Sequence, residues 1–148
     1  MKLYSVANGR TKNIEEVSDE AFTQKMMGDG MAIMSCDGCV YAPADGEVTM
    51  LFPTHHAIGI KTALGIEILI HIGIDTVEMN GDGFVAFVKQ GDKVKCGDLL
   101  IQFDLNKVIQ AGYEPDIMVI LTNTSQYQKM IKTTQDEIAV HDVLLEIE

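Results

Sequence analysis

Three of the four histidines of this chain lie in two neighbouring apolar runs of the sequence. His55 and His56 fall within residues 52–60, and His71 falls within residues 66–76. A neutral imidazole is a nucleophile that titrates near neutral pH and can carry a covalent group, and it also binds zinc. These two runs are therefore the first place to look for chemistry in the sequence.

Residues 62–65 between the two runs have the composition of a β-turn, with glycine at the fourth position, where type I turns favour it. A hairpin centred between residues 63 and 64 places His56 directly opposite His71, and the Cβ atoms of opposed residues lie about 4.5–5.5 Å apart. His55 then points to the other face of the strand. Two facing imidazoles could hold one small group, such as a phosphoryl group carried on one ring and supported by the other. A register change of one residue would break this arrangement.

Two other interpretations of these histidines stay open at this point. A histidine in a strand is more often a structural or surface residue than a catalytic one. The spacing of His71 and Asp75 also occurs in some zinc peptidases of related β architecture, and His56 could supply a third zinc ligand. Those enzymes also need an H-x-H pair, which this sequence does not contain.

The sequence around these histidines has the rhythm of an all-β domain. Glycine and Asn/Asp turns alternate with short runs rich in Val, Ile, Leu and Phe. The predicted strands are Met31–Met34, Val40–Tyr41, Glu47–Phe52, Ala57–Lys61, Ile66–Ile72, Phe84–Val88, Leu99–Phe103, Ile117–Asn123, Glu137–Val140 and Val143–Ile147. Two short helices are expected, at Val17–Met27 from its apolar spacing and at Leu105–Ala111 between the N-cap Asp104 and Gly112.

Composition limits the class of protein and of partner. The 148 residues amount to one domain, 1–148, with 47% hydrophobic residues and a net charge of −11. This charge repels phosphate backbones and anionic lipid headgroups, so we expect no nucleic-acid partner. No run approaches the roughly 20 apolar residues of a membrane span, and the N-terminus lacks a secretory signal. We therefore expect a cytoplasmic protein with no direct membrane insertion.

Two weaker motifs point to other functions. Cys36 and Cys39 have C-x-x-C spacing, but they lie in a predicted hairpin, and no second pair completes a four-cysteine zinc site. The third cysteine, Cys96, leaves an odd number, so no disulfide framework is implied. The Gly-Asp turns in residues 91–94 and 97–100 also occur in biotinyl and lipoyl domains, but the sequence has no modifiable lysine at a hairpin tip. We interpret that likeness as shared β architecture only.

Longer blocks of the sequence resemble one family over nearly the whole chain. The blocks are Ala42–Gly46, Thr54–Ala57 and Leu69–Glu78, with further agreement at 28–32, 81–84, 91–98 and 103–105. They resemble the glucose-family enzyme IIA (EIIA) of the bacterial phosphoenolpyruvate-dependent sugar phosphotransferase system. The resemblance implies a phosphocarrier with an all-β antiparallel sandwich, barrel-like and of the duplicated hybrid motif type, with short peripheral helices.

The resemblance also implies residue roles. His71 would accept a phosphoryl group on Nε2 from phospho-HPr and pass it to a cysteine of a sugar-specific EIIB domain. His56 would support the transfer, with Thr54 in the hydrogen-bond network. No cofactor is required, although His56 and His71 could share a zinc ion with a carboxylate of a partner protein. His55 stands where other members often have asparagine, so its role stays open.

The resemblance further suggests a partner-binding surface. It would consist of two acidic residues that face basic HPr and four apolar residues around the histidines: Asp29, Asp75, Met31, Ile58, Leu69 and Val77. The apolar four could equally be core residues and the aspartates turn formers. In some relatives the unphosphorylated form binds regulated uptake or metabolic proteins, and specificity for the sugar lies in the EIIB and EIIC partners. Because the chain starts close to where the family domain starts, we expect a free-standing EIIA without an N-terminal membrane-seeking tail.

Overall fold

The computed structural model describes residues 1–25, 27–123, 127 and 129–148. Its strands are β1 Lys2–Tyr4, β2 Gly9–Asn13, β3 Asp29–Ser35, β4 Cys39–Tyr41, β5 Gly46–Leu51, β6 Ala57–Thr62, β7 Glu67–Ile72, β8 Phe84–Ala86, β9 Lys93–Val94, β10 Leu99–Phe103, β11 Asp116–Leu121, β12 Met130–Lys132, β13 Glu137–Ile138 and β14 Val143–Ile147. The helices are α1 Glu20–Thr23 and α2 Leu105–Gln110, with 3₁₀ turns η1 Ile14–Glu16 and η2 Thr76–Met79.

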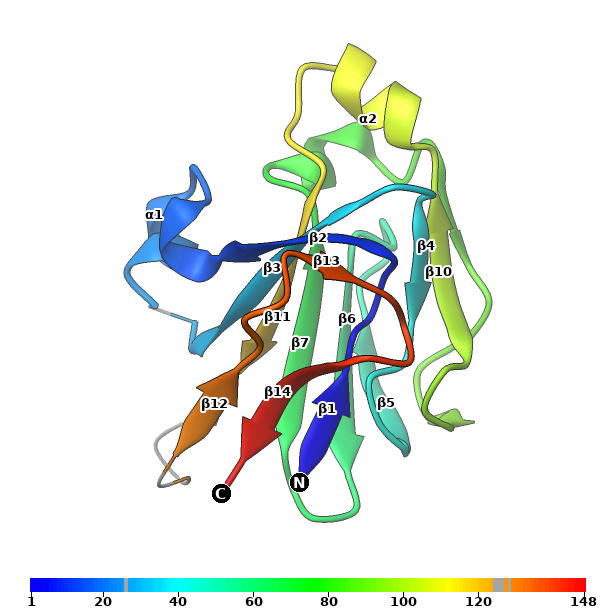
Figure 1. The fold of residues 1–148 in the computed structure, drawn as a ribbon. Helices are drawn as coiled ribbons and strands as arrows, with labels where there is room; N and C mark the ends of the chain where they lie inside the picture. Colours follow the sequence, from blue (N-terminus) through cyan, green and yellow to red (C-terminus); the bar gives the residue numbers. More distant parts are fainter. Residues whose placement is uncertain (26, 124–126, 128) are drawn as a thin grey trace.

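The strands form three antiparallel sheets (Figure 1). The large sheet has the order β13-β2-β3-β11-β7-β6-β5-β9, and two three-stranded sheets have the orders β1-β14-β12 and β4-β10-β8. None of these sheets closes into a barrel within the described residues. The predicted all-β antiparallel sandwich with short peripheral helices is confirmed.

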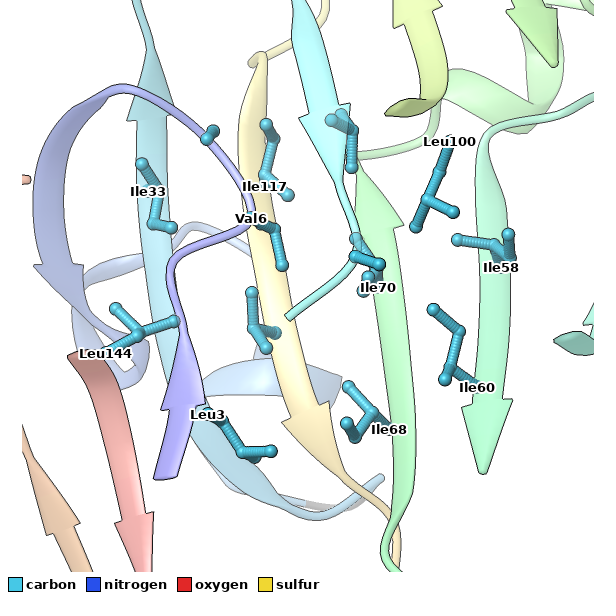
Figure 2. Close-up of a cluster of buried hydrophobic side chains, with 14 of the residues drawn as sticks. Leu3, Val6, Ile33, Ile58, Ile60, Ile68, Ile70, Leu100, Ile117 and Leu144 are labelled. Carbon is cyan, nitrogen blue, oxygen red and sulfur yellow. The ribbon is translucent and has the colours of Figure 1, made fainter. Parts of the chain in front are cut away.

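The main core lies between the large sheet and the smaller sheets, because strands of the large sheet alternate apolar side chains toward it. In β7 the side chains of Ile68, Ile70 and Ile72 are buried in this core, whereas Leu69 and His71 face the other way. Figure 2 shows Ile68 and Ile70 of β7 beside Ile58 and Ile60 of β6, together with leucines from the small sheets. Full burial of each isoleucine stabilises the fold by about 1.5–3 kcal/mol.

A second, smaller apolar cluster covers part of the outer face of the large sheet. It joins Phe22 of α1 and Ile14 of η1 to Met118 and Ile120 of β11, with Leu69 of β7 packed at its margin. Figure 1 shows α1 and the chain around it beside β3. This cover ends beside His71, whose side chain lies on the same outer face.

The structure confirms some of the predicted elements and corrects others. Strands Leu99–Phe103 and Val143–Ile147 have the predicted bounds, and α2 has Asp104 as its N-cap, whose carboxylate accepts a hydrogen bond from Lys107 N. The predicted helix Val17–Met27 is wrong in extent: only Glu20–Thr23 is helical, and Met26 of its apolar pattern lies outside the described residues.

Four strands were not predicted: β1, β2, β9 and β12. Strand β2 has the sequence Gly-Arg-Thr-Lys-Asn and lacks the apolar alternation that identifies a half-buried strand. Its pairing with β3 comes from the tertiary arrangement. The Cys36–Cys39 segment does not form a hairpin, because β3 pairs in the large sheet whereas β4 pairs with β10.

Candidate functional site

His56 lies just before the start of β6, and His71 lies near the end of β7. Because β6 and β7 pair antiparallel, these two ends lie side by side. The predicted register is wrong by one residue, because Ala57 and not His56 lies opposite His71. Gly65, at φ 87°, adds a third residue to the loop, and Thr62 N therefore bonds to Ile66 O.

The histidines nevertheless face each other, because His56 precedes the first residue of β6. The preceding turn closes with a hydrogen bond from His55 N to Phe52 O, and His55 has φ 59° in the left-handed region. His56 is thus free of the strand's alternation of faces, although its carbonyl still accepts from Ile72 N. The turn, and not the hairpin register, brings His56 to the His71 side.

The imidazole rings form the centre of a row of four aromatic rings. The ring centroids of His56 and His71 are 5.0 Å apart, with an interplanar angle of 79°. Phe22 packs edge-on against His71 and Phe52 against His56, each at a centroid distance of 5.2 Å. The two phenylalanines therefore flank the imidazole pair on its outer sides.

One nitrogen of His71 is fixed by the backbone. Its Nδ1 lies 2.9 Å from the carbonyl oxygen of Gly73. Because a carbonyl oxygen only accepts hydrogen bonds, Nδ1 carries the proton, and Nε2 of the neutral ring holds the lone pair. His71 therefore presents Nε2 as its nucleophilic atom.

Burial lowers the pKa of His71, whereas the Gly73 carbonyl and the carboxylates of Asp19 and Asp75 act in the opposite direction. The burial effect is the larger, so the neutral and nucleophilic form is favoured at neutral pH. The carboxylates remain close enough to stabilise a positive charge that develops on this ring.

His56 is buried and stays neutral to a lower pH. Burial, with a smaller contribution from His71, lowers the pKa of His56 to about 4. Its Nδ1 lies 2.5 Å from the hydroxyl oxygen of Thr54. In a neutral imidazole one nitrogen donates and the other accepts, so His56 is a hydrogen-bonding group and not a cation at neutral pH.

Residues 1–127 match the model of the family described as "phosphoenolpyruvate-dependent sugar phosphotransferase system, EIIA 1". The chain belongs to this family. Members are phosphotransferase components of that system, so the predicted phosphocarrier class is confirmed.

Individual relatives of this EIIA chain agree. It is 52% identical over 124 residues to the glucose-specific EIIA component of Halalkalibacterium halodurans, a match that covers 84% of the chain and 72% of the relative. The glucosamine-specific EIICBA component of Bacillus subtilis is 52% identical over 118 residues, covering 80% of the chain. The chain spans only 19% of that longer relative. The glucose permease IIA structure from Mycoplasma capricolum superimposes with a TM-score of 0.92 at 36% identity, covering 98% of this chain and 94% of the other.

The predicted partner-binding residues of this EIIA chain divide into two groups. Leu69 is half-buried on the same face as His71, and Val77 and Asp75 lie exposed in the segment that follows β7. Met31 and Ile58 are fully enclosed in the main core, so they do not form part of an exposed rim. Both lie in strands, where the alternation of faces turns them toward the core.

Asp29, the other acidic residue of the predicted HPr-facing surface, lies away from the histidines. It lies three residues along the ladder from the level of His71 and two strands away. Its carboxylate pairs with Lys132 at 2.8 Å and with Lys25 at 3.8 Å. Its charge is therefore largely compensated within the chain.

Sequence reasoning missed two residues that the structure places at the site. Phe22 packs on His71, and Asp19 raises the pKa of His71 through its charge. Both come from the segment around α1, about fifty residues earlier in the chain. The only signal in the sequence was the apolar spacing that included Phe22, which predicts burial and not the neighbour.

The described residues contain no group of three or more His, Cys, Asp or Glu side chains that could hold a metal ion. Two imidazoles leave at least one zinc ligand to come from elsewhere. No helix in the described part of the chain is long and apolar enough to span a membrane.

Proposed function

We propose that Nε2 of His71 accepts the phosphoryl group from phospho-HPr and passes it to a cysteine of an EIIB domain. The observation that carries this assignment is the hydrogen bond from His71 Nδ1 to the Gly73 carbonyl, which leaves Nε2 with the lone pair. The partly buried ring, neutral at working pH, supports the same assignment.

The bonds and protons of the relay balance with this tautomer. The Nε2 lone pair forms the N–P bond while the bond from phosphorus to the histidine nitrogen of HPr breaks, and that electron pair returns to the HPr ring. The Nδ1 proton stays on His71, so the phosphorylated ring is positive. In the second step an EIIB thiolate attacks phosphorus, and the N–P electron pair returns to Nε2. The Gly73 carbonyl, Asp19 and Asp75 all favour the positive intermediate.

His56 and Thr54 serve as the supporting groups. With the Thr54 hydroxyl donating to His56 Nδ1, the proton of the neutral ring is on Nε2, which donates to a phosphoryl oxygen. Phosphoryl transfer through a loose transition state depends chiefly on such positioned donors. The pKa of about 4 means that this donor is the neutral imidazole and not the imidazolium ion.

Other parts of the proposal follow from the family. We take EIIB as the acceptor because relatives such as the EIICBA component of Bacillus subtilis carry the matched stretch in longer chains with that name. HPr as the donor, a cytoplasmic location and a single domain over residues 1–148 are part of the same proposal. The relay needs no cofactor, and any zinc held by His56 and His71 takes its remaining ligands from a partner. A regulated uptake or metabolic protein would compete for the same face.

The direct test is intact-mass spectrometry at mildly alkaline pH after incubation with phosphoenolpyruvate, enzyme I and HPr. Wild-type protein should gain one acid-labile phosphoryl group, and His71→Ala should gain none. His56→Ala should accept the group and transfer it to EIIB far more slowly. An adduct that persists in His71→Ala would refute the assignment of the acceptor, and no adduct on folded wild-type protein would refute the relay.

A further inference from the structure

Thr76 is a fully buried polar residue. It is distinct from the two histidines and from Thr54, which hydrogen-bonds to His56. It begins η2, five residues after His71, and has no exposed surface. Its hydroxyl donates a hydrogen bond to the carbonyl oxygen of Ile72. Its methyl group packs on Gly73, because a Cβ added to that glycine would lie 2.3 Å from Thr76 Cγ2.

These contacts are part of a system that holds two consecutive peptide groups. The peptide group between Ile72 and Gly73 is held at its oxygen by Thr76 and at its N–H by the Asp116 carbonyl, at 2.7 Å. The next peptide group has its N–H, that of Ile74, bonded to Glu114 O at 2.9 Å. Its oxygen is the Gly73 carbonyl that accepts from His71 Nδ1.

Two of these four hydrogen bonds have backbone donors, and the other two have the side chains of His71 and Thr76 as donors. Thr76 is thus the side-chain donor of this group besides His71 itself. Gly73 has φ 77°, a conformation that glycine adopts without strain. Without a side chain, however, glycine also has access to a wide range of other backbone conformations. The hydroxyl and methyl group of Thr76 restrict that range from two sides. A shift of the Gly73 carbonyl would release Nδ1 and allow the proton to move to Nε2, which would remove the lone pair that the relay uses.

We propose that Thr76 is a positioning residue for the phosphoryl transfer: through the Gly73 peptide it keeps His71 in the tautomer with a free Nε2. The role rests on the proposed function of His71. Thr76 touches neither the phosphoryl group nor the reacting nitrogen.

The test compares variants of the full chain. Thr76→Val removes the hydroxyl and keeps the shape, and Thr76→Ser keeps the hydroxyl. Thr62→Val is the matched control, because Thr62 is also buried and its hydroxyl accepts from Ile66 N at 3.1 Å, but at the far end of β6. The first readout is the ¹⁵N chemical shifts of the His71 ring in the unphosphorylated protein, which report the tautomer directly. The second is the rate of phosphoryl gain from phospho-HPr.

Thr76→Val should show a mixed His71 tautomer and a roughly tenfold slower phosphoryl gain, the factor expected when an interaction of about 1.4 kcal/mol is lost. Thr76→Ser should restore both to near wild-type values. Thr62→Val should lose thermal stability without a change in tautomer or rate. Should the valine variant not fold, Thr76→Ala removes the same hydroxyl without a new methyl group in its place.

An unchanged tautomer and rate in a folded Thr76→Val or Thr76→Ala protein would overturn the proposal, as would equal losses in Thr76→Ser. The tautomer is measured without HPr or EIIB, so it separates this proposal from the relay itself. If the tautomer responds as expected but wild-type protein gains no phosphoryl group, the positioning of His71 stands and its proposed function fails.

Discussion

The segments that present the two histidines are held in different ways. His71 lies within a central strand of the large sheet. The chain after it folds back so that the Gly73 carbonyl accepts a hydrogen bond from His71 Nδ1. His56 lies outside the strand, after a turn with a left-handed residue, and its Nδ1 meets a hydroxyl group. A carbonyl imposes one tautomer, whereas a hydroxyl can donate or accept.

This difference shows how two identical side chains acquire unlike roles. The phosphoryl acceptor needs a lone pair at a fixed atom, and it needs nearby carboxylates that stabilise a positive charge on its ring. Both are found at His71. The supporting group needs a neutral donor that adapts to the phosphoryl oxygens, which suits a buried His56 with a pKa of about 4. Substitutions in each segment can test this division of roles.

The largest expected effect comes from a change in the segment after His71. Gly73→Ala introduces a Cβ at φ 77° that lies 2.3 Å from Thr76 Cγ2 and 3.0 Å from Glu114 O. Strain and overpacking together should cost roughly 2–5 kcal/mol of unfolding free energy and displace the carbonyl that holds His71. Denaturant unfolding and the phosphoryl-gain assay measure both.

Gly65→Ala is the matched control for that change. Gly65 has φ 87°, but an added Cβ there would meet no atom within 4 Å. It should cost only the left-handed strain of about 1–2 kcal/mol and leave phosphoryl gain unchanged. Equal stability losses at the two glycines would show that the packing around Gly73 does not restrict the His71 segment.

A smaller effect is expected from the pH dependence of His56. Between its usual pKa of about 6.5 and its folded value of about 4, the unfolded chain binds a proton that the folded chain does not. The unfolding free energy should therefore fall as the pH falls through this window, and His56→Gln should weaken the dependence.

In His71→Gln, NMR titration should show the pKa of His56 raised but still below its usual value, because burial is the larger cause of its low pKa. A His56 that titrates normally in wild-type protein would contradict the neutral-donor role.

The smallest effect concerns the carboxylates around His71. Asp19→Asn and Asp75→Asn should each lower the pKa of His71 further, because both charges raise it. Asp29→Asn should leave it unchanged, since Asp29 is paired with Lys132 and Lys25 away from His71. NMR titration of His71 in the three variants checks the order. A response to Asp29→Asn that equals the other two would show that Asp29 acts on His71 despite its ion pairs.

Much of the architecture could be predicted from local patterns in the sequence. Strand β10, strand β14 and helix α2 were predictable because apolar alternation, an N-cap aspartate and a following glycine are local signals. Polar strand β2 was not, because its partner β3 supplies the reason for its extended form. The extent of helix α1 failed for a similar reason: apolar spacing records burial and does not show where a helix ends.

At the site, the sequence by itself determined which residues could do the chemistry: His56, His71 and Thr54, in blocks specific to one family. Only the tertiary structure decided how they meet. The extra loop residue Gly65 shifts the hairpin register, and the left-handed turn at His55 compensates for it by freeing His56 from the strand. The structure also brought Asp19 and Phe22 to His71 and enclosed Met31 and Ile58 in the core. Residue type limits the reactions that are possible, but proximity, burial and tautomer depend on which distant segments pack together.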